Sequence, residues 1–146
     1  QELKADIVIP NDVDFQWHPK YIPQMLKKIE GGYDVVVPSR HLPESRDNFN
    51  FFRKLTHFFS NTLINYYWGG IQEVRDLAGN FKAIRVKGGL EKINFDRLNV
   101  KGFVIQATMI YELSKTGAKF CEIPVVYEDR RAGQPLRRGQ GHRGRP

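Results

Sequence analysis

The sequence contains a single cysteine, Cys121, so it cannot form an internal disulfide. This cysteine lies in the apolar segment Phe-Cys-Glu-Ile-Pro-Val-Val, and we expect a buried, packing thiol in a reducing compartment. Long apolar runs are also missing, and none approaches the roughly 18 to 20 residues that a membrane-spanning helix needs. Because the first residues lack a basic segment followed by an apolar one, we expect no signal peptide and, at most, peripheral membrane contact.

Acidic residues are absent from the segment Arg130 to Pro146, which contains six arginines. The rest of the chain has 17 basic and 16 acidic residues, so the segment supplies most of the net charge of +7. The body of the protein therefore lacks the electrostatic footprint of a nucleic-acid binder, and no nucleic-acid partner is expected. Residues 134–146 are predicted to be a disordered basic tail, because so few apolar side chains cannot offset the entropy of ordering.

The first forty residues predict a strand, a helix and a second strand. Ala5 to Pro10 is a short apolar run that ends at a proline, which is typical of a buried strand. Apolar residues recur at helical spacing from Pro19 to Glu30, and Gly31 and Gly32 end the pattern. A β-branched strand follows at Tyr33 to Pro38. This βαβ order predicts an α/β fold with a parallel sheet.

The remaining pattern continues the alternation of helices and strands. We expect a loop at 39–50, an aromatic-rich helix at 51–68, a strand at 80–86, a short helix at 89–93, a helix at 103–115 and a strand at 119–128. Because the first strand begins almost at residue 1, residues 1–133 are expected to be the C-terminal part of a domain whose N-terminal half is missing.

Two acidic residues follow the first predicted strand. Asp12 and Asp14 are two positions apart, so in extended backbone both carboxylates point the same way, with Gln16 next in that register. Such oxygen ligands suit a hard divalent cation, which could bridge the diphosphate of a nucleotide sugar and stabilise the leaving group. A turn or a solvated pair of acids is the alternative interpretation of a D-x-D on its own.

Six segments match, in order, the motifs of one enzyme family. They are DVDFQWHPKYI from Asp12, GYDVVVPSR ending at Arg40, RKLTHFFSN from Arg53, DLAGNFK from Asp76, KGFVIQ ending at Gln106, and EIPVVYEDR ending at Arg130. The series resembles the dolichyl-phosphate mannosyltransferases and the bacterial polyprenyl-phosphate glycosyltransferases of glycosyltransferase family 2. It covers roughly Ala5 to Gly133, and an ordered series is far more specific than any single motif.

The resemblance implies a partial GT-A, Rossmann-like sheet with flanking helices, which transfers a sugar with inversion from GDP-mannose or a UDP-sugar to a polyprenyl or dolichyl phosphate. The metal would be Mg²⁺ or Mn²⁺ on Asp12, Asp14 and Gln16. The implied partners are the nucleotide sugar, the lipid phosphate and, peripherally, the cytoplasmic face of a membrane.

The same resemblance implies roles for individual residues. Arg40, Arg53 and Ser60 would hold the acceptor phosphate, and Arg40 and Arg53 join Asp14 as catalytic candidates. Arg130 would close over the donor diphosphate, and Asp76 would head a loop beside the acceptor. For the two arginines of the acceptor site, the alternative is a surface ion pair with Glu44 or Asp47. The alternative for Arg130 is a partner at Glu128 or Asp129, and Asp76 could simply be a turn residue.

The sequence departs from the family pattern in three places. No acidic residue stands two positions after Gln106, and the Ser-Lys pair expected after Arg130 is missing. The opening motif that holds the nucleotide has no counterpart. A second function class therefore stays open, a non-catalytic module that binds a membrane surface or an anionic polymer. The helix predicted at 51–68 favours contact with a lipid interface, because its aromatic residues are too many for one buried face.

Overall fold

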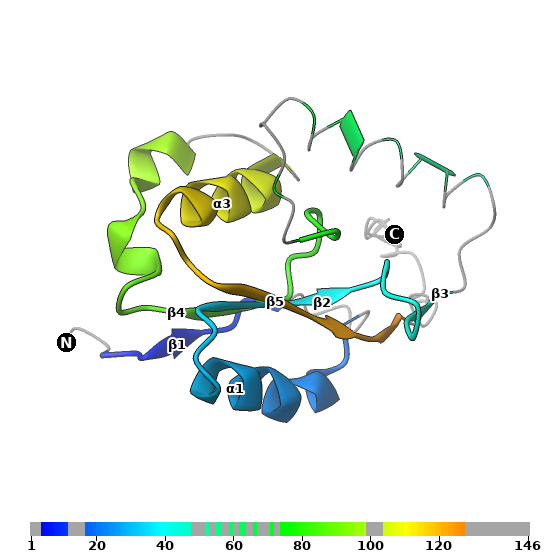
Figure 1. The fold of residues 1–146 in the computed structure, drawn as a ribbon, viewed down its shortest axis with the longest axis horizontal. Helices are drawn as coiled ribbons and strands as arrows, with labels where there is room; N and C mark the ends of the chain where they lie inside the picture. Colours follow the sequence, from blue (N-terminus) through cyan, green and yellow to red (C-terminus); the bar gives the residue numbers. More distant parts are fainter. Residues whose placement is uncertain are drawn as a thin grey trace, which may run out of the picture.

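A computed structural model of the chain describes residues 4–11, 17–47, 52, 55, 56, 59, 62, 63, 66, 71, 74–98 and 104–127. In these residues, four strands form one sheet in the order β1-β4-β2-β5 (Figure 1). Their bounds are β1 Ile7–Val8, β2 Val35–Ser39, β4 Ala83–Arg85 and β5 Phe120–Pro124. A second, two-stranded sheet pairs β3 Arg46–Asp47 with β6 Val126–Tyr127. The predicted α/β class is confirmed.

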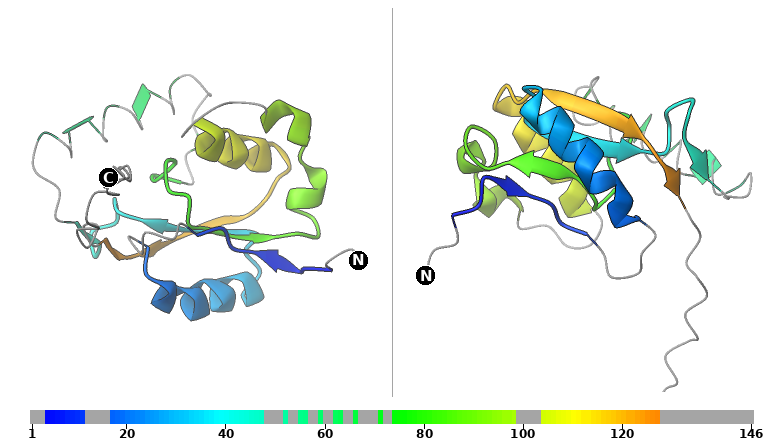
Figure 2. Two further views of the ribbon diagram at one scale, coloured as in Figure 1. Left: turned by 180° about the vertical axis from the view of Figure 1, so that it is seen from behind. Right: turned by 90° about the horizontal axis from the view of Figure 1, so that it is seen from below.

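Two α-helices cover opposite faces of the larger sheet. Helix α1 (Ile22–Glu30) lies on one face and α3 (Val104–Lys115) on the other, so the sheet is the middle of three layers (Figures 1 and 2). Short 3₁₀ helices precede α1 (η1, Pro19–Tyr21) and fill the connection between β4 and α3 (η2, Leu90–Lys92, and η3, Phe95–Leu98).

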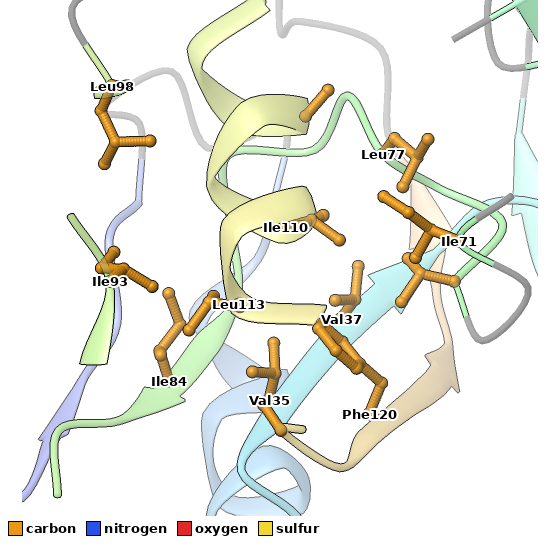
Figure 3. Close-up of a cluster of buried hydrophobic side chains, with 13 residues drawn as sticks. Val35, Val37, Ile71, Leu77, Ile84, Ile93, Leu98, Ile110, Leu113 and Phe120 are labelled. Carbon is orange, nitrogen blue, oxygen red and sulfur yellow. The ribbon is translucent and has the colours of Figure 1, made fainter. Parts of the chain in front are cut away.

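The alternation of side chains along β2 explains why both of its faces are buried. Val35 and Val37 pack in the cluster under α3, whereas Val36 packs with Met25 and Ile29 of α1. All three valines have no exposed surface. Figure 3 shows the cluster on the α3 side, which also contains Ile84, Ile110, Leu113 and Phe120. A strand covered on both faces reads as a continuous apolar run, as this one does.

The prediction of a parallel sheet is wrong in part. β2 and β5 are parallel, but β4 pairs antiparallel with both β1 and β2. β1 and β2 therefore run in the same direction, as a βαβ unit requires, with β4 inserted between them. An apolar run reveals a buried strand but not its direction or its neighbours.

Other predicted elements are shorter or divided. The loop predicted at 39–50 contains β3, and the strand predicted at 119–128 divides at Val125 into β5 and β6. The short helix at 89–93 is the 3₁₀ helix η2, and η3 was not predicted. The thiol of Cys121 is half-buried rather than fully buried, and burial raises its pKa. The predicted tail, 134–146, lies outside the described residues.

Because β4 runs against its neighbours, several chain segments meet at one end of the larger sheet. β1, β2 and β5 end at this edge, and the antiparallel strand β4 begins there. Arg40 follows the end of β2, while Asp76 and Lys82 lie in the segment that leads into β4. Residues from distant parts of the sequence are thus collected where parallel strands of α/β folds present ligand-binding groups.

Candidate functional site

Two of the predicted site residues, Arg40 and Asp76, are described by the structure, and it brings them together. Arg40 Nε donates to Asp76 Oδ2 and Arg40 Nη2 donates to Asp76 Oδ1, each at 2.7 Å. The backbone N–H of Arg40 also donates to Oδ2, at 3.2 Å. Paired N–H···O bonds of this kind fix both the position and the plane of a guanidinium group. The other candidates, Asp12, Asp14, Gln16, Arg53, Ser60 and Arg130, lie outside the described residues.

Burial makes the ion pair different from the surface pair considered as an alternative. The side chain of Arg40 is 8% exposed and that of Asp76 is 0% exposed. Burial alone would raise the pKa of Asp76, but the hydrogen bonds and charge of Arg40 outweigh it and hold this pKa below its ordinary value. Arg40 therefore pairs with a buried aspartate that is distant in sequence.

Trp17 covers the guanidinium group of Arg40. Arg40 Cζ lies 5.3 Å from the centre of the indole ring, within the range of a cation–π interaction. The same ring lies 6.3 Å from Phe81, and a Cβ atom added at Gly79 would be 3.4 Å from Trp17 Cζ2. The loop backbone at Gly79 therefore lies close to the indole ring. Trp17 thus joins three segments of the site, a role that sequence reasoning did not predict.

The site also contains a buried lysine, Lys82, whose charge interacts with that of Asp76. Lys82 is 0% exposed, and its Nζ donates to Oε1 of Gln106, in α3, at 2.5 Å. Burial lowers the pKa of Lys82 to about 8, although the negative charge of Asp76 acts in the opposite direction. In the sequence, Gln106 stands out for the acidic residue that is missing two positions after it, but its pairing with Lys82 was not predicted. Thr108, at the position of that acid, donates to the carbonyl of Val104 within its own helix.

Glu122 of β5 holds the backbone of the loop that carries Asp76. Its Oε1 accepts hydrogen bonds from the backbone N–H of Arg75 at 2.8 Å and of Asp76 at 3.1 Å. The motif EIPVVYEDR contained this glutamate, but nothing local in the sequence indicated which N–H groups it would meet.

A row of apolar residues is exposed on the helix predicted at 51–68. The residues of this stretch that the structure describes are helical, and several large apolar side chains among them are exposed: Phe52 by 78%, Leu55 by 41%, Phe59 by 61%, Leu63 by 58% and Tyr66 by 83%. Their spacing of three or four residues places them on one face of a helix. We refer to these five residues as the apolar stripe.

Two further observations concern metals and membranes. Within the described ranges, no three His, Cys, Asp or Glu side chains are grouped as metal ligands. None of the helices that the structure describes is both long and apolar enough to cross a bilayer. His18 caps η1 by accepting a hydrogen bond from the backbone N–H of Lys20 at 3.0 Å.

Comparison with known proteins identifies relatives that share this chain's pattern. An undecaprenyl-phosphate mannosyltransferase of Micrococcus luteus is 23% identical over 134 residues, which cover 91% of this chain and 54% of the relative. A dolichol-phosphate mannosyltransferase of Pyrococcus furiosus is 25% identical over 141 residues, covering 96% of this chain and 38% of the relative. A polyprenol monophosphomannose synthase of Mycolicibacterium smegmatis is 23% identical over 128 residues, covering 87% and 47%.

The chain spans about half the length of the curated relatives it matches, with shares of 38% to 54%. The model of glycosyl transferase family 2 matches residues 1–88, which is more than half of the chain. The mixed sheet between two helices agrees with part of a GT-A, Rossmann-like fold. On this evidence, the chain belongs to glycosyltransferase family 2.

Proposed function

We propose that the chain is the acceptor-binding part of an enzyme that transfers a sugar, with inversion, from GDP-mannose or a UDP-sugar to a polyprenyl phosphate. The observation that carries the proposal is the buried, oriented Arg40–Asp76 pair at the ligand-binding edge of the sheet. The names of the relatives support the class of acceptor. A lipid phosphate needs positively charged hydrogen-bond donors, and a guanidinium group fixed in one plane is suited to that task.

The chemistry of the acceptor explains why the site needs charge more than a general base. A phosphate monoester is already anionic at neutral pH, so no proton must be removed before it attacks. One phosphate oxygen forms a bond to the anomeric carbon while the bond from that carbon to the donor diphosphate breaks. The diphosphate leaves with the electron pair. Arg40, with Arg53 and Ser60, would hold the acceptor in line for this displacement.

The donor side of the site rests on residues beyond those that the structure describes. Asp12, Asp14 and Gln16 offer two carboxylates and an amide, a set of oxygen ligands that suits Mg²⁺ or Mn²⁺. When bound, the cation would supply positive charge that stabilises the leaving diphosphate. Arg130 would contact the same diphosphate.

The test of acceptor binding is transfer of radiolabelled mannose from GDP-mannose to polyprenyl phosphate, in the protein restored to the length of its relatives. Arg40→Ala should lower kcat/KM by a factor of at least about 100, since a charged hydrogen-bonding partner of the phosphate is lost. Arg97→Ala is the matched control, because Arg97 also pairs with a carboxylate, that of Glu112, but is 61% exposed. Equal activities of the two variants would contradict the proposed role of Arg40.

A second substitution addresses the proposed cation. Asp14→Asn removes one carboxylate with little change in size, and transfer should be abolished. Chelation with EDTA should have the same effect on the unchanged protein, and added Mg²⁺ or Mn²⁺ should reverse it. Undiminished transfer by the Asp14→Asn variant would remove the cation site from the proposal.

We also propose that the apolar stripe contacts the cytoplasmic face of a membrane, where the lipid phosphate is presented. Exposed aromatic side chains on one helix face are favoured at the lipid interface. In liposome flotation, a Phe52→Ser, Phe59→Ser double variant should bind less than the unchanged chain, whereas deletion of residues 134–146 should leave binding largely intact. Loss of all liposome binding after deletion of the tail would instead indicate that the basic tail binds the membrane.

The apolar stripe also supports the second candidate function, a non-catalytic module that binds a membrane surface. The transfer assay separates the two functions. Liposome binding without any transfer by the length-restored protein would favour the binding module.

A further inference from the structure

Glu122 contacts the candidate site from β5, the strand adjacent to the one that leads to Arg40. In the parallel register of β2 and β5, Glu122 lies beside Val37, and Arg40 directly follows Ser39, the last residue of β2. The two adjacent strands therefore act on the same loop residue, Asp76. Arg40 binds its carboxylate, and Glu122 binds its backbone N–H.

The loop needs such a partner because it is buried without regular secondary structure. Asp76 and Leu77 have no exposed surface, yet neither belongs to a helix or a strand. Asp76 is fully buried, so its backbone N–H requires an acceptor, and it shares a single carboxylate oxygen of Glu122 with the N–H of the exposed Arg75. Bonds to a charged acceptor are stronger than those between neutral groups. Glu122 thus fixes the position of the loop backbone, and with it the position of the Asp76 carboxylate relative to the guanidinium group of Arg40.

We propose that Glu122 is a positioning residue for Arg40, acting through the backbone and side chain of Asp76. The functional meaning of this position rests on the proposed function, in which Arg40 holds the acceptor phosphate. The positioning itself is a property of the folded chain and can be measured without turnover.

The experiment measures hydrogen exchange of the Arg40 Nε–H group by NMR in the full chain. This proton is held by Asp76 Oδ2, so its exchange reports on the ion pair directly. Glu122→Ala should accelerate its exchange by at least about tenfold, because both loop N–H groups lose their acceptor. Glu122→Gln keeps an acceptor oxygen at the same place and should restore most of the protection. Glu91→Ala, at an exposed glutamate of η2, is the control and should change nothing.

A role in general stability would give a different result. The backbone amide of Ile110, in the core of α3, reports on global opening. If Glu122→Ala accelerates exchange of Arg40 Nε–H and of the Ile110 amide by the same factor, or leaves the former unchanged, the proposal is overturned. Should Glu122→Ala be too unstable to study, a comparison of Glu122→Gln with Glu122→Asp applies the same criterion, since the shorter aspartate cannot reach both N–H groups.

Failure of the proposed function gives a pattern of its own. Selective loss of Arg40 protection in a protein that transfers no sugar would support the positioning and remove the proposed activity. In an active protein, Glu122→Ala should raise the KM for polyprenyl phosphate more than it lowers kcat, with recovery in Glu122→Gln. Normal exchange at Arg40 alongside normal transfer would overturn the positioning and leave the activity intact.

Discussion

Arg40 and Asp76 are distant in sequence, and they pair because the fold brings them together. Arg40 was identified from a motif as a ligand of the acceptor phosphate, with a surface ion pair to Glu44 or Asp47 as the alternative. Asp76, a buried partner, is brought in by the segment that leads into β4, which packs beside β2. Sequence reasoning could name the arginine because the motif is local. It could not name the pair, because the contact depends on strand order.

Replacing the buried aspartate should be costly. Asp76→Asn removes the negative charge that the buried guanidinium group of Arg40 binds, so the free energy of unfolding should fall by about 3 to 5 kcal/mol. Urea denaturation at pH 7 measures the change. The surface variant Arg97→Ala, in contrast, should cost no more than about 1 kcal/mol. A loss below 1 kcal/mol in Asp76→Asn would mean that the pair contributes little to folding.

The same aspartate should make the fold sensitive to acid. Its pKa is lower in the folded state than the ordinary value of 3.8, so above pH 3.8 the ionised carboxylate contributes its full stabilisation. That contribution is lost as the pH falls from 3.8 through the folded-state pKa. Denaturation curves of the unchanged protein and of Asp76→Asn should therefore converge in this acidic range. Parallel pH profiles of the two proteins would contradict the expectation.

Lys82 should also make stability rise with pH, but in the alkaline range. Its pKa is about 8 in the folded state and 10.5 when unperturbed, so between these values the unfolded chain binds more protons and stability rises with pH. The cost of keeping the ammonium buried below pH 8 is on the order of 3 kcal/mol. Lys82→Met should lack this rise, which the difference between the two pH profiles of unfolding would reveal. An identical slope in both proteins would show that Lys82 titrates normally.

At the scale of elements, α3 combines two tasks. Its buried residues Ile110 and Leu113 cover Val35 and Val37 of β2, as Figure 3 shows, and Gln106 near its start holds Lys82. The helix itself was predictable, since Phe103 to Lys115 is a long apolar segment ended by Gly117. The contribution of α3 to the site was not predictable, because the sequence does not show which buried cation the amide of Gln106 will bind.

The core contact of α3 gives a prediction of stability. Ile110→Ala should lower the free energy of unfolding by about 2 to 5 kcal/mol, because a fully buried side chain would leave a cavity against the sheet. Val104→Ala is the control in the same helix, since Val104 is 49% exposed and its loss should change stability by only about 0.5 kcal/mol. Similar effects of the two substitutions in urea denaturation would argue against the packing described.

At the scale of the whole molecule, the sequence predicted the class and most element positions but not the sheet's order. Hydrophobic runs revealed β1, β2 and β5 because each is a short apolar segment with a clear boundary, although β1, which was expected to be buried, leaves Val8 39% exposed. They could not show that the three-residue strand β4 lies between β1 and β2 and runs against them. The family motifs located Arg40 and Asp76 because each motif is a short continuous segment. The sequence did not predict the roles of Trp17, Lys82 and Glu122, because these roles depend on contacts that form only in the assembled sheet.

The candidate site lies at the end of the larger sheet where β2 and β5 finish and β4 begins. The turns at the opposite end of the sheet, around Gly32, Gly88 and Gly117, carry none of its residues. All three glycines have positive φ angles, which marks tight reversals of the chain. A fluorophore, an affinity tag or a fused reporter would thus be best attached beside Gly88, where it faces away from the candidate site.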